Sequence, residues 1–220
     1  MTTAFPESSD IKMKKQRISL ILSSLIAVAL FLVSCRDSGP LTLTYDKGNL
    51  TDQRSGITYM ITPMCFEPIA TELEPYAVCT EPELELFGIV GCDPSEWLSE
   101  KFEGIGYVYF AGEEDELPSI DEFDANLIVI CVEQTITTGI GTVSDKGDIE
   151  NIVDAFINGE RTTIIPEGDF YKLKFASDKY PGIYYNLLYI EADNGENYIY
   201  DRSTKTCSAV GDVMYDYLPR

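Results

Sequence analysis

The residue type that most restricts the chemistry of this 220-residue chain is one it lacks, because the sequence contains no histidine. Ser-His-Asp and Cys-His catalytic arrangements and His-ligated zinc sites are therefore excluded. No G-x-S-x-G, P-loop or C-x-x-C motif occurs in the sequence either. The chemistry that remains rests on carboxylates, tyrosines and cysteines.

Carboxylates could catalyse a reaction without histidine. The chain has 37 Asp and Glu residues, and a glycoside hydrolase needs only two of them. Because acids are so abundant, spacing singles out no pair. The densest acidic run, Glu113–Glu116, lacks the spacing of a calcium loop and predicts a solvated turn. A carboxylate-dependent glycan hydrolase is therefore the alternative function, and the sequence assigns no catalytic residue, no metal ligands and no cofactor.

Tyrosines are concentrated in the last quarter of the chain. If Asn194-Gly195 forms a two-residue hairpin turn, Tyr189 lies opposite Tyr200 in the two strands. The tyrosines that would then share one face of the sheet, and that form the candidate ligand face, are Tyr185, Tyr189, Tyr198 and Tyr200. Two interpretations remain open: aromatic packing across strands, and a platform for a sugar or a peptide, since tyrosine offers both an apolar face and a hydroxyl.

Cysteines raise the question of disulfides. The cysteines that follow Cys35 are Cys65, Cys79, Cys92, Cys131 and Cys207. Because their number is odd, at least one stays unpaired or pairs between molecules. Cys131 lies in the apolar run Leu127–Val132, where a thiol packs like a small apolar group, so we predict that it is free. The other four either form two disulfides, in one of three ways, or remain thiols.

Near the N terminus an apolar run ends at Leu32-Val33-Ser34-Cys35 and follows Lys14, Lys15 and Arg17. Its uninterrupted part, Leu25–Val33, is shorter than the roughly 20 residues that a membrane-spanning helix needs. The basic start, the short apolar core and the small residue before the cysteine match a cleaved secretory signal. Residues 13–35 thus resemble the lipobox signal of bacterial lipoproteins.

That resemblance implies that residues 1–34 are a signal peptide and that a diacylglyceryl group on Cys35 anchors the chain to the outer side of the cell membrane. Two acyl chains give stable anchoring. Met13 opens a signal of more usual proportions than Met1 does. Residues 35–40 are then the anchor and a short linker, and residues 41–220 a single extracellular domain. The rival interpretation is an uncleaved anchor helix.

Net charge limits the partners of that domain. The formal charge is −21, and removal of residues 1–34, which contain four basic and two acidic residues, changes it to −23. Nucleic acid is excluded as a partner, because phosphate contacts need clusters of Lys and Arg. The expected partners are the membrane, through Cys35, and a glycan or a peptide as ligand. The sequence sets no oligomeric state.

Strands make up most of the predicted elements. They are expected at Leu41–Tyr45, Ile57–Ile61, Leu127–Val132, Phe170–Phe175, Ile183–Ala192 and Asn197–Asp201. The stretch Pro63–Glu85, rich in Pro and Glu, breaks the periodicity and predicts an irregular crossing loop. Asp93–Glu96 and Ser119–Glu122 carry capping patterns and predict short helical turns, the first continuing through Trp97 and Leu98.

The clearest helix is predicted over about residues 145–158, between the cap Ser144-Asp145 and Gly159. Its apolar stripe consists of Ile149, Ile152, Val153, Phe156 and Ile157. The sequence therefore predicts an α+β fold, a mostly antiparallel sheet with one well-capped amphipathic helix and short helical turns. The predicted function is a membrane-anchored, non-catalytic binding module.

Overall fold

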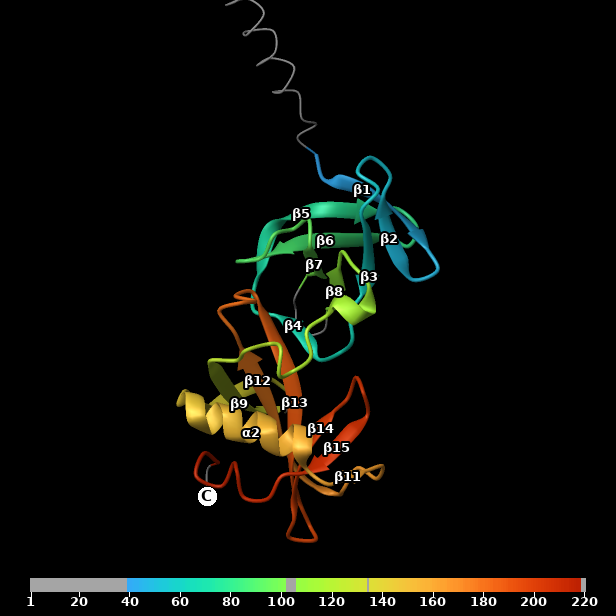
Figure 1. Cartoon of the computed structure of the whole chain (residues 1–220). Helices are drawn as coiled ribbons and strands as arrows, with labels where there is room; N and C mark the ends of the chain where they lie inside the picture. The colour runs from blue at the N-terminus through green and yellow to red at the C-terminus, as the bar shows by residue number, and fades with distance from the viewer. Residues whose placement is uncertain (1–38, 102–105, 134, 219–220) are drawn as a thin grey trace, which may run out of the picture. The chain divides into compact units, whose positions relative to one another are not determined.

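Strands dominate the computed structural model, which describes residues 39–101, 106–133 and 135–218 (Figure 1). Of these residues 47% lie in strands and 9% in helices. The predicted α+β class with its short helical turns is therefore wrong, and the fold is β-rich. Residues Pro40–Arg220 form one compact unit. The predicted signal peptide and the anchor Cys35 lie outside the described residues.

Seven strands close into a barrel in the order β1-β2-β3-β8-β7-β6-β5. Their bounds are β1 (Leu41–Asp46), β2 (Asn49–Asp52), β3 (Thr58–Ile61), β5 (Thr71–Cys79), β6 (Leu84–Ile89), β7 (Trp97–Glu100) and β8 (Val108–Phe110). Neighbouring strands are antiparallel, except that β1 and β5 pair in parallel and close the barrel. Leu50, Tyr59 and Leu86 are among the buried residues of its core.

Strands occupy most of the stretch Pro63–Glu85, namely a short strand at Phe66–Pro68, the whole of β5 and the start of β6, so the predicted irregular crossing is wrong. Pro75 fits into β5 because it lies where the register with β6 shifts, and because β1 pairs with β5 only from Ala77 to Cys79. Its missing N–H therefore costs no hydrogen bond to β1. Polar residues of β5 such as Glu74, which made this stretch look like a loop in the sequence, face solvent.

The two capping patterns stop at a single turn. Asp93 Oδ1 accepts a hydrogen bond from Ser95 N at 2.8 Å, and the chain then enters β7 at Trp97. Ser119 Oγ donates to Glu122 at 2.7 Å, and the turn ends at Phe123. Trp97 and Phe123 are 4% and 0% exposed. Their burial in the core takes the chain out of the helical path after each turn.

A second sheet has the order β10-β9-β12-β13-β14-β15-β11. Its strands are β9 (Leu127–Glu133), β10 (Thr137–Val143), β11 (Arg161–Thr162), β12 (Gly168–Ala176), β13 (Ile183–Ala192), β14 (Asn197–Asp201) and β15 (Thr206–Ala209). The short strand β4 (Phe66–Pro68), which follows β3 of the barrel in the chain, pairs with Ile183–Tyr185 at the start of β13. A 3-10 turn, η1 (Glu114–Glu116), completes the short elements.

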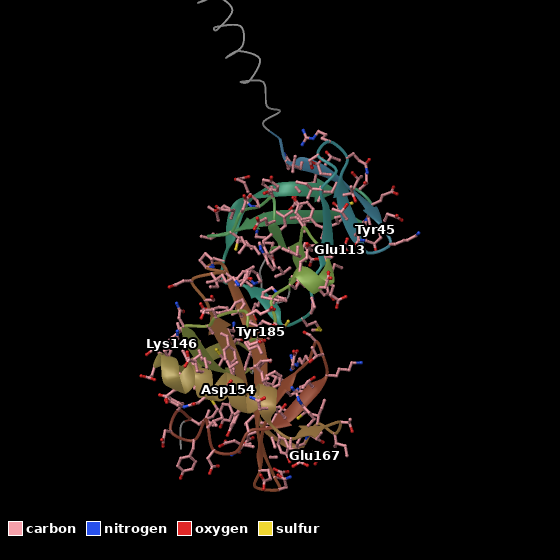
Figure 2. All side chains as sticks on the ribbon, in the orientation of Figure 1. Tyr45, Glu113, Lys146, Asp154, Glu167 and Tyr185 are labelled. Carbon is pink, nitrogen blue, oxygen red and sulfur yellow. The ribbon has the colours of Figure 1, made fainter. Side chains whose placement is uncertain are left out.

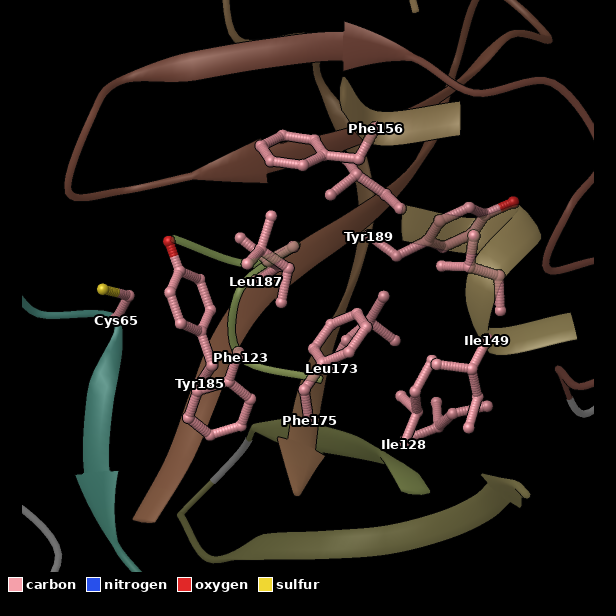
Figure 3. Packing of buried hydrophobic residues seen from close by; sticks show 14 of the residues in the cluster. Cys65, Phe123, Ile128, Ile149, Phe156, Leu173, Phe175, Tyr185, Leu187 and Tyr189 are labelled. Atoms are coloured by element: carbon pink, nitrogen blue, oxygen red, sulfur yellow. The ribbon is translucent and has the colours of Figure 1, made fainter. Parts of the chain in front are cut away.

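The helix α2 (Lys146–Asn158) packs on the core of this sheet. Asp145 caps it by accepting hydrogen bonds from Gly147 N and Asp148 N at 2.9 and 3.2 Å. The side chains that α2 buries in the core are Ile149, Ile152 and Phe156, of which Figure 3 labels Ile149 and Phe156. Lys146 and Asp154 are exposed (Figure 2). The C-cap Gly159 has a φ of −65°, so it is not left-handed. Glycine is needed because a Cβ would lie 2.3 Å from Ala209 O.

The turn between β13 and β14 contains three residues, Asp193–Gly195, rather than two. Ala192 N donates to Glu196 O at 3.1 Å, and Gly195 has a φ of 86°, as three-residue hairpin loops require. Tyr200 consequently lies opposite Leu188, and Tyr189 lies opposite Ile199. The register predicted from a two-residue turn is wrong by one position, and such a shift turns each side chain to the other face of the sheet.

Candidate functional site

The register divides the candidate ligand face between the two faces of the sheet. Tyr185 and Tyr189 are 5% and 1% exposed and belong to the core cluster that contains Phe156 of α2 (Figure 3). Tyr198 and Tyr200 are partly exposed and lie on the other face, since their β13 partners are Ile190 and Leu188. The four tyrosines therefore form no common surface.

Tyr200 instead lines a pocket of about 370 Å³, a volume within the range of small-molecule sites. Lys172 of β12, Leu188 of β13 and Tyr200 of β14 lie opposite one another in the register and share the sheet face that lines it. Glu67 of β4 and Val108 of the barrel strand β8 also line the pocket. Residues from distant parts of the chain therefore converge on one cavity.

Glu67, Glu133, Lys172, Lys174 and Asn186 form a group of polar contacts that we call the pocket floor, and Glu67 lies at its centre. Its Oε2 lies 2.7 Å from Lys172 Nζ and accepts a hydrogen bond from Asn186 Nδ2 at 3.1 Å. Its Oε1 pairs with Lys174 Nζ, and Lys172 Nζ also lies 3.0 Å from Glu133 Oε1. The side chains of Glu67, Lys172 and Lys174 are 12%, 16% and 13% exposed. These ion pairs are thus largely removed from solvent, where pairing has to offset desolvation.

Pairing outweighs burial in setting the charge of this floor. Burial alone would raise the pKa of Glu67, but the hydrogen bonds from Lys172 and Lys174 hold that pKa below its ordinary value. Burial alone would lower the pKa of Lys172, but Glu67 and Glu133 raise it. Both groups stay charged near neutral pH, so neither readily exchanges a proton as a general acid or base must.

Two further polar groups at the pocket have unused bonding capacity. Asn186 Oδ1 is buried and accepts no hydrogen bond from the residues that the structure describes. Arg202 is exposed at the pocket and makes no ion pair or hydrogen bond within the described part of the chain. One acceptor and one cation are therefore open to a ligand.

The cysteines after Cys35 are all free thiols in the structure, including Cys131, for which the sequence predicted this state. The two-disulfide alternative for Cys65, Cys79, Cys92 and Cys207 is not formed. Burial raises the pKa of Cys65 to about 11 and also raises the pKa of Cys131. Because the thiolate is the reactive form, the raised pKa makes both thiols weak nucleophiles near neutral pH.

The described ranges 39–101, 106–133 and 135–218 contain no group of three or more Cys, Asp or Glu side chains placed to hold a metal ion. They also contain no helix that is long and apolar enough to cross a membrane.

Sequence reasoning missed the lysines of β12. The run Tyr171-Lys172-Leu173-Lys174-Phe175 alternates apolar and charged residues, a pattern typical of a strand with one buried and one polar face. Two lysines two positions apart, in a chain with only 16 basic residues, were the signal that could have pointed to this face. Glu67 could not be found in this way, because its surroundings predicted a loop.

Comparisons with known proteins identify no family for this chain. None of the protein-family models, curated proteins and solved structures compared with it matches.

Replacing Glu67 by Gln should destabilise the domain by about 3 kcal/mol near neutral pH, because Lys172 and Lys174 would lose their shared buried counter-charge. The folded pKa of Glu67 lies below its ordinary value of 4.5. Its contribution to stability is therefore present above about pH 4.5 and is lost as the pH falls through the folded pKa. Urea unfolding of both proteins across this pH range measures the difference.

The matched control is Glu150→Gln, which breaks the exposed pair with Lys146, whose N–O distance is 3.6 Å. This change should alter the free energy of unfolding by about 0.5 kcal/mol at most. If the two substitutions cost the same, Glu67 does not hold the pocket floor together.

Proposed function

We propose that this chain is a surface lipoprotein, anchored to the outer side of the cell membrane, whose acidic domain binds a small polar ligand without catalysing a reaction. The pocket with its fixed charges at Glu67 and Lys172 carries the binding half of this proposal. The segment Leu32–Cys35, with its likeness to a lipobox, supports the anchoring half.

The composition of the pocket supports a binding role. Phe66, Val108 and Leu188 give it apolar walls, and small-molecule sites combine such walls with a few convergent polar groups. The ion pairs of Glu67 hold Lys172 and Asn186 in place before a ligand arrives. A ligand then loses little affinity to the ordering of side chains.

The hydrolase alternative is less well supported by the same residues. A glycoside hydrolase needs one carboxyl group that carries a proton, usually in an apolar environment. Glu67 and Glu133 are the carboxylates that line the pocket, and both contact Lys172. The low pKa of Glu67 opposes the role of proton donor, so the arrangement favours binding over hydrolysis.

Lipidation places the domain near the membrane in this proposal. The strand β1 begins at Leu41, so only residues 36–40 would connect the lipidated Cys35 to the folded domain. An anchor with two acyl chains gives stable attachment without a spanning helix. The pocket would then meet ligands close to the cell surface.

Replacing Cys35 by Ser should abolish lipidation and move the protein out of the membrane fraction. The measurement is fractionation of cells after labelling with a radioactive fatty acid. Cys92→Ser, which removes a thiol within the domain, should leave both labelling and fractionation unchanged. If the Cys35 variant stays in the membrane after a high-salt wash, the anchor is the apolar segment itself and not a lipid.

Replacing Tyr200 by Ala should weaken ligand binding about tenfold or more, because this partly exposed ring lines the pocket. Ligands are identified by binding of the detergent-solubilised full-length protein to glycan and peptide arrays, and their affinities are measured by titration. Tyr45→Ala, at a ring of β1 that is 49% exposed and does not line the pocket, should bind like the parent. Blank arrays, or equal binding by the Tyr200 variant, would contradict a binding role for this pocket.

A further inference from the structure

The hydrogen-bonding groups left unpaired at the pocket floor favour a ligand that carries hydroxyl groups. Asn186 Oδ1 is buried without a donor among the described residues, so a ligand that enters the pocket gains by offering one. Lys172 carries three N–H donors, and its ion pairs with Glu67 and Glu133 engage two of them. A hydroxyl both donates and accepts, so neighbouring hydroxyls of one molecule suit both residues. An ammonium group on the ligand would instead be repelled by Lys172.

The charge at the pocket points to an anion. The whole chain has 37 acidic and 16 basic residues, yet the lining residues include two of each kind, Glu67 and Glu133 with Lys172 and Arg202. Lys174 binds the same carboxylate as Lys172, so positive charge is in excess here. The guanidinium of Arg202 is open within the described chain, and its planar fork suits a carboxylate.

Apolar surface at the pocket suits the ring of a sugar. Met64 and Tyr107 line the pocket and are 68% and 49% exposed, and Tyr200 lines it as well. Tyrosine presents a flat apolar face together with a hydroxyl. A pyranose ring packs its C–H face on such surfaces and directs its hydroxyls to polar groups at the edge.

We propose that the pocket binds an acidic sugar, a hexuronic acid whose hydroxyls bond to Asn186 and Lys172 and whose carboxylate pairs with Arg202. This assignment rests on the binding function proposed above and adds the class of ligand. Free hexuronate and a uronic acid unit within a glycan share this chemistry, so the test includes both.

Isothermal titration of the detergent-solubilised full chain distinguishes these ligands. The probes are D-galacturonate, D-glucuronate and tetragalacturonate, with D-galactose and D-glucose as neutral counterparts. An N-acetylated alanine dipeptide serves as a carboxylate that has neither sugar hydroxyls nor an ammonium group. We expect at least one acidic sugar to bind about tenfold or more tightly than its neutral counterpart. If the affinity for tetragalacturonate exceeds that for galacturonate by more than the fourfold statistical factor, the site binds a glycan chain. If it does not, the site binds the free acid.

The variant Arg202→Gln should lower the affinity for the acidic sugar about tenfold or more and remove the preference over the neutral sugar. Arg54→Gln is the control, since it removes the same charge from a barrel turn that does not line the pocket. It should bind like the parent. Arg202 is exposed, so its variant should fold, and a thermal melt of the same preparation checks this.

Equal affinities for galacturonate and galactose, or an unchanged affinity in the Arg202 variant, would overturn the acidic-sugar assignment. Binding of the dipeptide in place of the sugars would overturn it as well, while the binding function would stand. If none of these probes binds, the assignment is wrong, and array hits that depend on Tyr200 then decide separately whether the pocket binds another ligand.

Discussion

The burial of Glu67 between Lys172 and Lys174 is the interaction on which the arrangement of this domain depends most. A charge removed from water has to be paired, and β4 supplies that charge to the sheet face where β12 presents its lysines. The strand β4 follows directly on the barrel strand β3, so the same contact fixes how the chain passes from barrel to sheet. Asn186 N donates to Cys65 O at 2.7 Å and secures that passage beside the ion pairs.

These contacts hold the polar side chains of the pocket in place. Lys172 and Asn186 are held by Glu67 rather than by a ligand, so their donors and acceptors are oriented in advance. The same pairing keeps the charges permanent, which suits recognition and not proton transfer. In the proposed function, this is where a domain with an excess of acids would bind a negative group.

The sequence predicted the elements whose burial follows a regular period. The strands expected at Phe170–Phe175 and Asn197–Asp201 are β12 and β14, and the apolar stripe from Ile149 to Phe156 faces the core. The barrel strand β5 was missed because Pro75 lies at a shift in register, which depends on how β6 pairs with it. The hairpin register failed because the bond from Ala192 to Glu196 sets the loop length. Neither feature is visible in local sequence.

The pocket itself was beyond sequence reasoning for a related reason. Glu67 lies 107 residues from Lys174 and 119 residues from Asn186 along the chain, and only the pairing of β4 with β13 brings them together. The predicted tyrosine face was wrong because the predicted register was wrong by one position. Tyr200 lines the pocket because it lies opposite Leu188. Pairing between strands far apart in the sequence therefore determines which residues form the site, while local sequence patterns predict most of the strands and the helix.

The most direct test of the central contact is a ¹³C NMR titration of the Glu67 side-chain carboxyl carbon, with its signal assigned by comparison with Glu67→Gln. If the two lysines outweigh burial, the carbon titrates with a pKa below the ordinary value of 4.5. A pKa at or above 4.5 would mean that burial prevails and that the lysines do not hold this carboxylate, which would contradict the fixed-charge pocket.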